Sequence, residues 1–191
     1  QAAITKAHIP ERMDELSPSD PARARLAYDE FFAHQVTLAL ARARERKTKG
    51  RVSVGTGTLQ TSVLKALPYE PTGAQTRAVR DIAEDMATPL RMNRLLQGDV
   101  GSGKTLVAFL ALRVAVDSGG QGVMMAPTEI LARQHLDGLR PLAESAGVVL
   151  ELLTGRDKGK ERGAKLAALK QGKIQILVGT HAVFQKDVEF D

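Results

Sequence analysis

The chain has 191 residues, of which 43% are hydrophobic and 26% charged, and it carries a net charge of +5. A chain of this length and composition can bury a sizeable core, which favours a globular domain over a disordered or fibrous one. It has no cysteine, which excludes a disulfide framework and cysteine-ligated zinc, and its four histidines never fall at a metal-ligand spacing.

Nothing in the sequence would direct the chain to a membrane. No apolar run approaches the ~20 residues that cross a bilayer, and residues 1–15 lack the apolar core of a signal peptide. We therefore expect a cytoplasmic protein. Because the chain opens on Gln1 and stops at Asp191 just after an apolar stretch, we also expect a piece of a longer protein.

Residues 1–67 are predicted to form a linker and a long helix. Residues 1–19 are polar and without periodicity, which predicts a linker. The helix is predicted to begin at Asp20, with Pro21 in its first position, and to fray near Gly50. Its apolar side chains form a stripe that needs a partner surface: Tyr28, Phe31, Phe32, Val36 and Leu40.

The pattern of apolar residues changes after the long helix. Residues 52–60 are predicted as strand or loop, with a turn at Gly55 and Gly57, and residues 61–68 as a short helical turn. From Pro68 onward apolar strands alternate with helices, which predicts a parallel α/β sheet flanked by helices. The predicted strands cover residues 94–97, 122–127, 148–155 and 174–180. The predicted helices cover residues 72–86, 104–117 and 128–140, followed by a basic helix that ends at Gln171.

Three of these helices carry further expectations. Helix 104–117 is apolar nearly all round, so it has to be buried. Pro141 is expected to end or kink helix 128–140. Helix 72–86 is expected to turn one apolar face inward: Ala78, Val79, Ile82 and Met86.

Positive charge gathers in two stretches. Residues 42–51 hold six basic residues and one acid, and residues 156–173 hold seven basic and two acidic ones. Such stretches suit a polyanion such as nucleic acid, but they also occur as solvated helix ends. Charge alone leaves both interpretations open.

The segment "GDVGSGKT" fits the phosphate-loop pattern of a glycine, four residues, glycine, lysine and serine or threonine. Backbone N–H groups in such a loop line an anion site at a helix amino terminus. We expect Lys104 to reach the β and γ phosphates of a nucleotide and the Thr105 hydroxyl to ligate Mg²⁺. The predicted nucleotide-binding residues of this loop are Gly98, Asp99, Val100, Gly101, Ser102, Gly103, Lys104 and Thr105.

Three other segments have a structural and a functional interpretation. In "PYEPTGAQ", Thr72 and Gln75 form a capping box, while the same glutamine amide could match donor and acceptor groups on a base edge. In "APTEILARQH", Thr128 caps a helix whose start, with Arg133, also suits a nucleic-acid phosphate. In "VGTHA", Thr180 and His181 follow a strand in the same way.

The segments "GDVGSGKT", "APTEILARQH" and "GTHAVFQ", in this order and spacing, resemble the first motor domain of the RecG family of superfamily 2 DNA helicases. The resemblance covers nearly the whole chain, since residues 21–44 and "LPYEPTGAQ" look like the segment that joins the family's DNA-binding wedge domain to its motor. Pro71 departs from the apolar residue usual in relatives and puts only the local entry angle in doubt. The transcription-repair coupling translocase has a similar motor but differs in its third motif.

The resemblance implies an ATP-dependent helicase or translocase, associated with the bacterial nucleoid, that acts on branched or forked double-stranded DNA in recombination and repair. It implies a P-loop NTPase (RecA-like) fold with Gln75 as adenine reader, ATP and Mg²⁺ as cofactors, and Lys104 and Thr105 as catalytic residues. The implied nucleic-acid-binding residues are Pro127, Thr128, Glu129, Arg133, Gly155, Thr180 and His181.

The resemblance also implies a domain plan. Residues 1–67 would join the wedge domain to the motor, and residues 68–191 would form the first RecA-like domain, truncated before its acidic box. That box, the wedge and the second RecA-like domain would lie outside this chain, so we expect little catalysis by these residues alone.

Two other classes stay open. A different phosphate-loop enzyme, such as a GTPase or small-molecule kinase, would leave "APTEILARQH" and "GTHA" without a role, and no NKxD base-reading motif is present. A nucleotide- or DNA-binding module without catalysis would fit the isolated chain. The sequence does not indicate the preferred branched substrate, the direction of travel or the oligomeric state.

Overall fold

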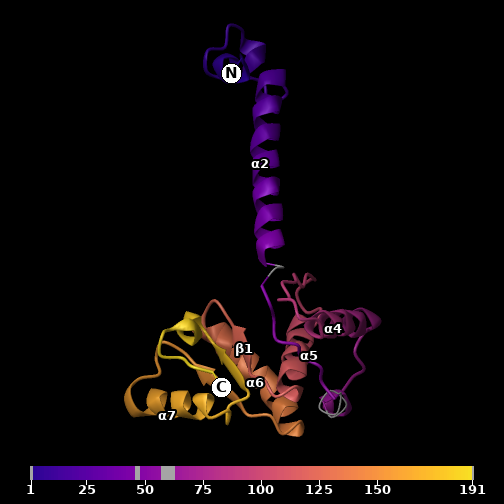
Figure 1. Cartoon of the computed structure of the whole chain (residues 1–191), viewed down its shortest axis with the longest axis vertical. Coiled ribbons are helices and arrows are strands. Elements are labelled where there is room, and N and C mark those ends of the chain that lie inside the picture. Colours follow the sequence, from indigo (N-terminus) through magenta and orange to yellow (C-terminus); the bar gives the residue numbers. More distant parts are fainter. Residues whose placement is uncertain (1, 46–47, 57–62, 191) are drawn as a thin grey trace. The chain divides into compact units, whose positions relative to one another are not determined.

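The computed structural model describes residues 2–45, 48–56 and 63–190 (Figure 1). The chain divides into two compact units, Gln1–Lys49 and Gly50–Asp191. This division falls before residue 68, the boundary expected from sequence, because the intervening residues belong to the second unit. The Ser53 N–H donates to the Met86 carbonyl at 2.8 Å, and Val63 is fully buried in the core. The functional assignment of the two parts stays a prediction.

The first unit is more ordered than the sequence suggested. Residues 1–19 were expected to be an irregular linker, but they contain α1 (Ala2–His8) and the 3₁₀ helix η1 (Met13–Leu16), which pack at the start of α2 (Pro21–Glu45) (Figure 1). The reason is a cluster of charges at their junction. The Lys6 ammonium lies 3.5 Å from the Glu15 carboxylate and 3.3 Å from the Asp20 carboxylate, and both carboxylates are buried.

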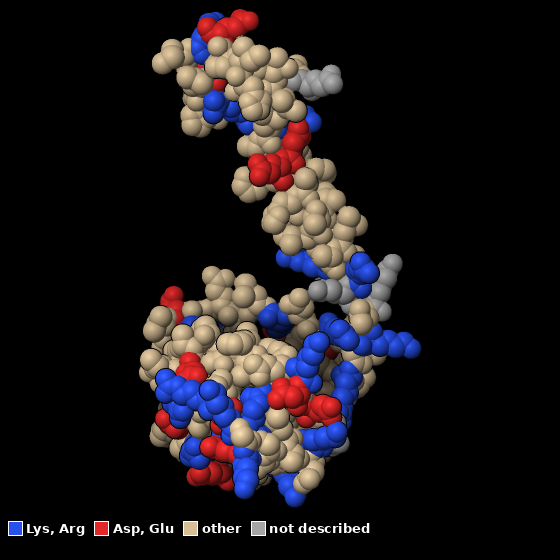
Figure 2. Space-filling model, turned by 90° about the vertical axis from the view of Figure 1, so that its left-hand side faces the viewer, with Lys and Arg blue, Asp and Glu red and all other residues tan. Residues whose placement is uncertain are grey.

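Helix α2 confirms the predicted long helix and its start at Pro21. Its apolar stripe from Tyr28 to Leu40 is exposed, and Figure 2 shows the uncharged stretch along the middle of the helix. The Tyr28 and Phe32 rings stack on each other with their centroids 6.0 Å apart. Within the described residues of the first unit, therefore, this stripe makes contacts along its own helix and is not covered by another element of that unit.

The second unit is an α/β domain, as predicted. After a helical turn at residues 63–66, its elements are α4 (Gly73–Met86), α5 (Lys104–Asp117), β1 (Gly122–Met125), α6 (Glu129–Ser145), β2 (Leu150–Leu153), α7 (Gly159–Lys170), β3 (Ile176–Gly179) and η2 (His181–Phe184). The three strands are parallel and lie in the order β1-β3-β2. Ile176 is in register with Gly122 on one side and Leu150 on the other.

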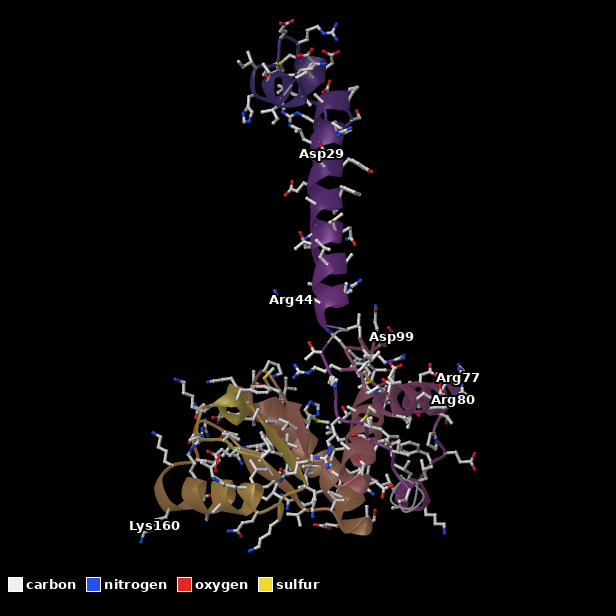
Figure 3. All side chains as sticks on the ribbon, in the orientation of Figure 1. Asp29, Arg44, Arg77, Arg80, Asp99 and Lys160 are labelled. Carbon is white, nitrogen blue, oxygen red and sulfur yellow. The ribbon has the colours of Figure 1, made fainter. Side chains whose placement is uncertain are left out.

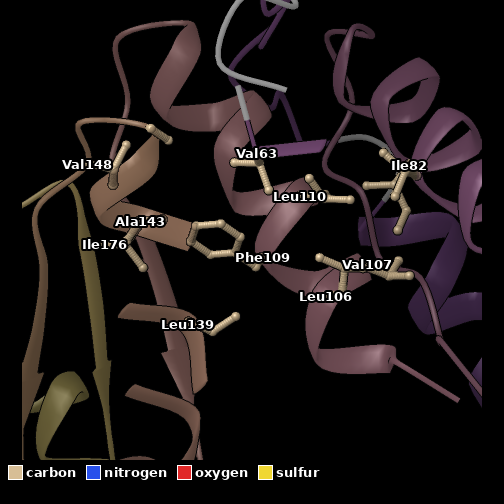
Figure 4. Close-up of a cluster of buried hydrophobic side chains, with 12 residues drawn as sticks. Val63, Ile82, Leu106, Val107, Phe109, Leu110, Leu139, Ala143, Val148 and Ile176 are labelled. Carbon is tan, nitrogen blue, oxygen red and sulfur yellow. The ribbon is translucent and has the colours of Figure 1, made fainter. Parts of the chain in front are cut away.

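Helices cover both faces of this sheet, because side chains alternate along each strand. Ile176 of β3 packs in a cluster with Phe109 of α5 and Leu139 of α6 (Figure 4). Its neighbour Leu177 points to the other face and packs with Leu169 of α7. The expected burial of α5 is thus confirmed, and α4 in turn packs on α5.

The structure differs from two local expectations. Residues 94–97 were predicted as a strand, but they form no strand with any described residue, and Leu95 is exposed. A strand is defined by its ladder, which local sequence cannot supply. Pro141 was expected to end or kink its helix; it does not end it, since α6 continues to Ser145 with Leu139 and Ala143 buried on either side of the proline, while the kink stays a prediction.

None of the described helices is both long enough and apolar enough to span a bilayer.

Candidate functional site

The glycine loop 98–103 leads directly into α5. Gly101 and Gly103 have φ angles of +83° and +79°, in the left-handed region that side-chain-bearing residues rarely adopt. A Cβ on Gly103 would collide with the Gln75 side chain, and one on Gly98 would lie 2.7 Å from the Ser102 hydroxyl oxygen. The loop is therefore built by glycines that allow both the turn and the close approach. At the start of α5 the Leu106 and Val107 N–H groups donate to the Gly103 carbonyl, whereas those of Lys104 and Thr105 have no acceptor among the described residues.

Lys104 lies over this loop. Its ammonium group donates to the carbonyl oxygens of Gly98 and Asp99, each at 2.7 Å. The positive charge thus sits within the turn whose backbone could hold an anion, next to the amino terminus of a 14-residue helix. The arrangement suits a phosphate group, which would offer the ammonium stronger acceptors than neutral carbonyls.

Thr105 follows in the first turn of α5. Its side chain is half-buried, and the hydroxyl makes no hydrogen bond to any other described residue. The residues that the structure describes contain no group of three or more histidine, aspartate or glutamate side chains that could hold a metal ion. A Mg²⁺ ion at Thr105 would therefore take most of its oxygen ligands from a bound nucleotide and water, which is the usual coordination of Mg²⁺ in nucleotide-binding proteins.

Gln75 connects the start of α4 to the glycine loop. Its carbonyl oxygen accepts the Thr72 N–H at 2.9 Å, and the Thr72 hydroxyl accepts the Gln75 N–H at 3.3 Å, which confirms the capping box. The Gln75 amide group also donates to the Ser102 carbonyl at 2.9 Å. An amide has two donors and two acceptor positions. One donor and one acceptor position of the Gln75 amide remain unused, so this side chain can cap α4 and recognise a base at the same time.

The predicted nucleic-acid residues follow the three strands. Pro127, Thr128 and Glu129 come after β1, Gly155 after β2, and Thr180 and His181 after β3. Because the strands are parallel, their carboxyl ends meet at one edge of the sheet. The structure thus brings these three segments together, and Arg133, one turn into α6, is exposed beside them.

Within this edge the individual residues differ. The Thr128 hydroxyl accepts the Leu131 N–H at 3.3 Å and caps α6, as expected. Thr180 is buried, whereas His181 is exposed and begins η2. The Glu129 carboxylate pairs with Arg156 at 2.7 Å, a contact between the ends of β1 and β2.

Sequence reasoning named Gly155 in the loop after β2 and noted the basic stretch 156–173 that begins there, but it missed the contacts that fix the loop. The Asp157 carboxylate accepts the Thr154 N–H at 2.7 Å and pairs with the Lys165 ammonium at 2.7 Å. Burial works against the charged forms, but these contacts prevail, so the pKa of Asp157 is lowered and that of Lys165 is raised. The spacing of Thr154 and Asp157 is a turn signal that could have indicated the fold of this loop, whereas Lys165 comes from α7.

The basic stretch 42–51 has at least one structural role. Arg51 donates to the carbonyl oxygens of Ser118 and Gly119, at 3.5 and 2.9 Å, just past the end of α5. A guanidinium group there is favourable to the helix dipole. Arg42 and Arg44 are exposed on the last turn of α2, as a solvated helix end requires, and contact of this stretch with nucleic acid stays a prediction.

A glycine loop at a helix start beside a parallel sheet, with polar segments at the carboxyl ends of the strands, is the architecture of a P-loop nucleotide-binding motor domain. The sequence profile described as DEAD/DEAH box helicase matches residues 72–190. The chain belongs to this family.

Within the family the resemblance to RecG is confirmed. The chain is 44% identical over 171 residues to the ATP-dependent DNA helicase RecG of Escherichia coli K12, covering 90% of this chain and 25% of that relative. It is 47% identical over 189 residues to RecG of Bacillus subtilis, covering 98% and 27%. A solved structure, "Structure of RecG bound to three-way DNA junction", matches 98% of this chain and 25% of its own at 39% identity, with a TM-score of 0.78. The chain spans about a quarter of the length of these relatives.

Proposed function

We propose that this chain is the nucleotide-binding part of an ATP-dependent DNA helicase or translocase that acts on branched or forked double-stranded DNA in recombination and repair. The observation that carries the proposal is the glycine loop at the start of α5, with Lys104 held inside it, in a chain of the DEAD/DEAH box helicase family. The relatives named ATP-dependent DNA helicase and the complex with a three-way DNA junction support the substrate. A cytoplasmic, nucleoid-associated location is part of the same proposal.

In this proposal the loop residues 98–105 bind the phosphates of ATP. The Lys104 ammonium exchanges its two carbonyl acceptors for β and γ phosphate oxygens, and the Thr105 hydroxyl holds Mg²⁺. When bound, Mg²⁺ neutralises charge on the phosphates. Gln75 uses its remaining donor and acceptor for the adenine while it keeps α4 capped. The role of these residues is to bind and orient the nucleotide.

The carboxyl edge of the sheet is proposed to contact the DNA backbone. Thr128, Arg133, Gly155, Thr180 and His181 lie on or beside this edge, together with Pro127 and Glu129. Backbone contacts of this kind fix the position of a motor on DNA without reading its sequence. Such contacts suit a motor that moves along DNA of any sequence.

The test is ATP hydrolysis by the full-length protein that contains this chain, with forked duplex, linear duplex and no DNA. We expect DNA to stimulate hydrolysis, and forked DNA to do so more strongly than linear duplex. The Lys104→Ala variant controls for contaminating ATPases. Hydrolysis that ignores DNA, or that survives in the Lys104→Ala variant, would contradict the proposal.

A further inference from the structure

A salt bridge joins two segments of the carboxyl edge that are far apart in sequence. The Arg156 Nε lies 2.7 Å from a Glu129 carboxylate oxygen. Glu129 is the first residue of α6, after β1, and Arg156 lies in the loop after β2, with β3 between the two strands. A carboxylate at this edge would repel a phosphate, so its presence there needs a reason. The salt bridge gives one, because the Glu129 carboxylate can hold the Arg156 side chain in place.

The backbone that carries Arg156 is braced on both sides. The Arg156 N–H donates to the Thr154 hydroxyl at 3.3 Å, and the Asp157 carboxylate accepts the Thr154 N–H at 2.7 Å. Asp157 also pairs with Lys165, whose ammonium donates to the Leu152 carbonyl at 3.0 Å. Loops without such contacts lose conformational entropy when they bind a ligand. The contacts of the loop that carries Arg156 order it before any ligand binds.

The Arg156 side chain itself is free to meet a partner. It is 79% exposed, whereas the side chains of Glu129 and Asp157 are 27% and 9% exposed. Its Nε is the nitrogen nearest to the Glu129 carboxylate, and its terminal nitrogens form no hydrogen bond within the described ranges 2–45, 48–56 and 63–190. A guanidinium group carries five N–H donors in a planar fork that matches a phosphate. The terminal donors are therefore left for an incoming phosphate.

We propose that Arg156 binds a DNA backbone phosphate, and that Glu129, Asp157 and Lys165 are the residues that position it. This inference rests on the proposed function, since it names a further contact of the same DNA-binding edge. Asp157 and Lys165 act through the loop backbone and do not touch the DNA. Glu129 acts through the Arg156 Nε.

The test is binding of a fluorescent forked duplex by the full-length protein over a series of salt concentrations. Loss of one phosphate contact reduces the slope of log K against log [salt] by about 0.9. We expect this reduction for Arg156→Gln. The matched control is Arg80→Gln, which removes the same charge from an exposed arginine on the outer side of α4 (Figure 3) and leaves the slope unchanged.

The positioning role is tested by Asp157→Asn, because the sign of its effect is diagnostic. Removing a negative charge should strengthen DNA binding if only overall charge matters. Asp157→Asn loses contacts to Thr154 and Lys165 and should melt at a lower temperature, so binding is compared at a temperature where circular dichroism shows the variant to be folded. If Asp157 positions Arg156, the folded variant binds DNA more weakly than wild type. In an Arg156→Gln background the same change should then cause no further loss.

The outcomes separate the two levels of the proposal. If the wild-type protein shows no salt-dependent binding of forked DNA, both the proposed function and this inference are wrong. If it binds, but Arg156→Gln behaves like Arg80→Gln, only the assignment of Arg156 is wrong. Stronger binding by Asp157→Asn would limit Asp157 to a structural role and overturn its positioning role.

Discussion

Lys104 shows how one side chain can be placed by its own loop before any ligand is present. Its ammonium rests on two carbonyl oxygens in a part of the loop that is exposed to solvent. Hydrogen bonds of this kind contribute little to stability, because water replaces them readily. The lysine is thus held near the anion site without being needed for the fold.

We predict that Lys104→Ala abolishes tight ATP binding and leaves thermal stability nearly unchanged. The lost interaction is a full charge against the nucleotide phosphates, whereas the folded state loses only exposed contacts. Calorimetric titration with ATP and a thermal unfolding curve measure the two effects. An unchanged ATP affinity would mean that the phosphates bind elsewhere.

Gln75 lets capping and nucleotide recognition be separated by substitution. Gln75→Ala should cost about 1 kcal/mol of stability through the capping box and should reduce the preference for ATP over GTP. Gln75→Glu keeps an acceptor for the Thr72 N–H but loses the amide donor to the Ser102 carbonyl. We expect this second variant to be nearly as stable as wild type and still to lose base preference.

The measurements are denaturant unfolding and competition between ATP and GTP. If both variants keep the wild-type preference for ATP, Gln75 has no role beyond the cap and its bridge to the glycine loop. If only Gln75→Ala loses the preference, the carbonyl oxygen of Gln75 is the group that recognises the base.

Among the elements, α1, η1 and the start of α2 depend on two buried carboxylates. The Glu11 N–H donates to the Glu15 carboxylate at 2.8 Å and lowers its pKa, assisted by Lys6. Burial works against the charged form of Asp20, but hydrogen bonds from the Ala22 N–H and the Lys6 ammonium outweigh it, so its pKa is also lowered. Both groups therefore favour the folded unit when they are charged.

We predict that acid destabilises this unit first. A carboxyl group with a lowered folded pKa contributes stability that is complete above its unfolded pKa of about 4 and is lost as the pH falls through the folded value. Far-ultraviolet circular dichroism should show helix loss below that pH. Asp20→Asn should show part of this loss at neutral pH, and an acid transition that is identical in the variant would contradict the assignment.

Helix α5 contains a feature that local sequence does not reveal. Arg113 is 1% exposed, and its three side-chain nitrogens have no hydrogen-bond partner in the residues that the structure describes. Burial lowers the pKa of its guanidinium, opposed by Asp117, and the group lies 5.9 Å from the Phe109 ring centroid. Together with Ser53 and other side chains it lines a cavity of about 140 Å³.

We predict that Arg113→Met keeps the fold and raises the free energy of unfolding by about 1 kcal/mol or more, because a buried charge without a hydrogen-bond partner in the described residues is costly and methionine fills similar space. Leu110→Ala on the same helix should instead lower it by about 2–5 kcal/mol. Denaturant unfolding measures both. Marked destabilisation by Arg113→Met would show that the guanidinium has a partner that stabilises the fold.

At the scale of the whole molecule, all the residues named in the proposed function lie in the second of the two units. The second unit holds the phosphate loop and the carboxyl edge of the sheet, and its face in Figure 2 mixes basic and acidic side chains. The first unit presents the exposed stripe of α2. Hydrolysis of ATP needs carboxylates that hold Mg²⁺ and orient water, and the domain plan expected from the resemblance to RecG, which stays a prediction, does not include them in residues 1–191.

We therefore predict that residues 1–191 alone bind ATP weakly and do not hydrolyse it. The assay is ATP turnover by the purified chain, with and without branched DNA, and with Lys104→Ala as the control for contamination. Turnover that depends on Lys104 would mean that a catalytic carboxylate lies within these residues and that the domain plan inferred from the resemblance is wrong.

Local patterns in the sequence were sufficient to predict much of this protein. The glycine loop, the capping box of Thr72 and Gln75, the cap at Thr128 and the bounds of α5 depend on neighbouring residues, and all agree with the structure. Short apolar runs predicted the buried strands, and apolar faces of period 3.6 predicted helices, for the same reason. The family resemblance rests on these local segments.

Only the tertiary structure decided which distant residues meet. It removed residues 94–97 from the strands, gave Arg51 a place at the end of α5, buried Arg113, and joined Glu129 to Arg156. A strand needs a neighbour to pair with, and a buried or paired charge depends on groups far along the chain. Sequence spacing carries no record of such contacts, because chain folding alone brings their partners together.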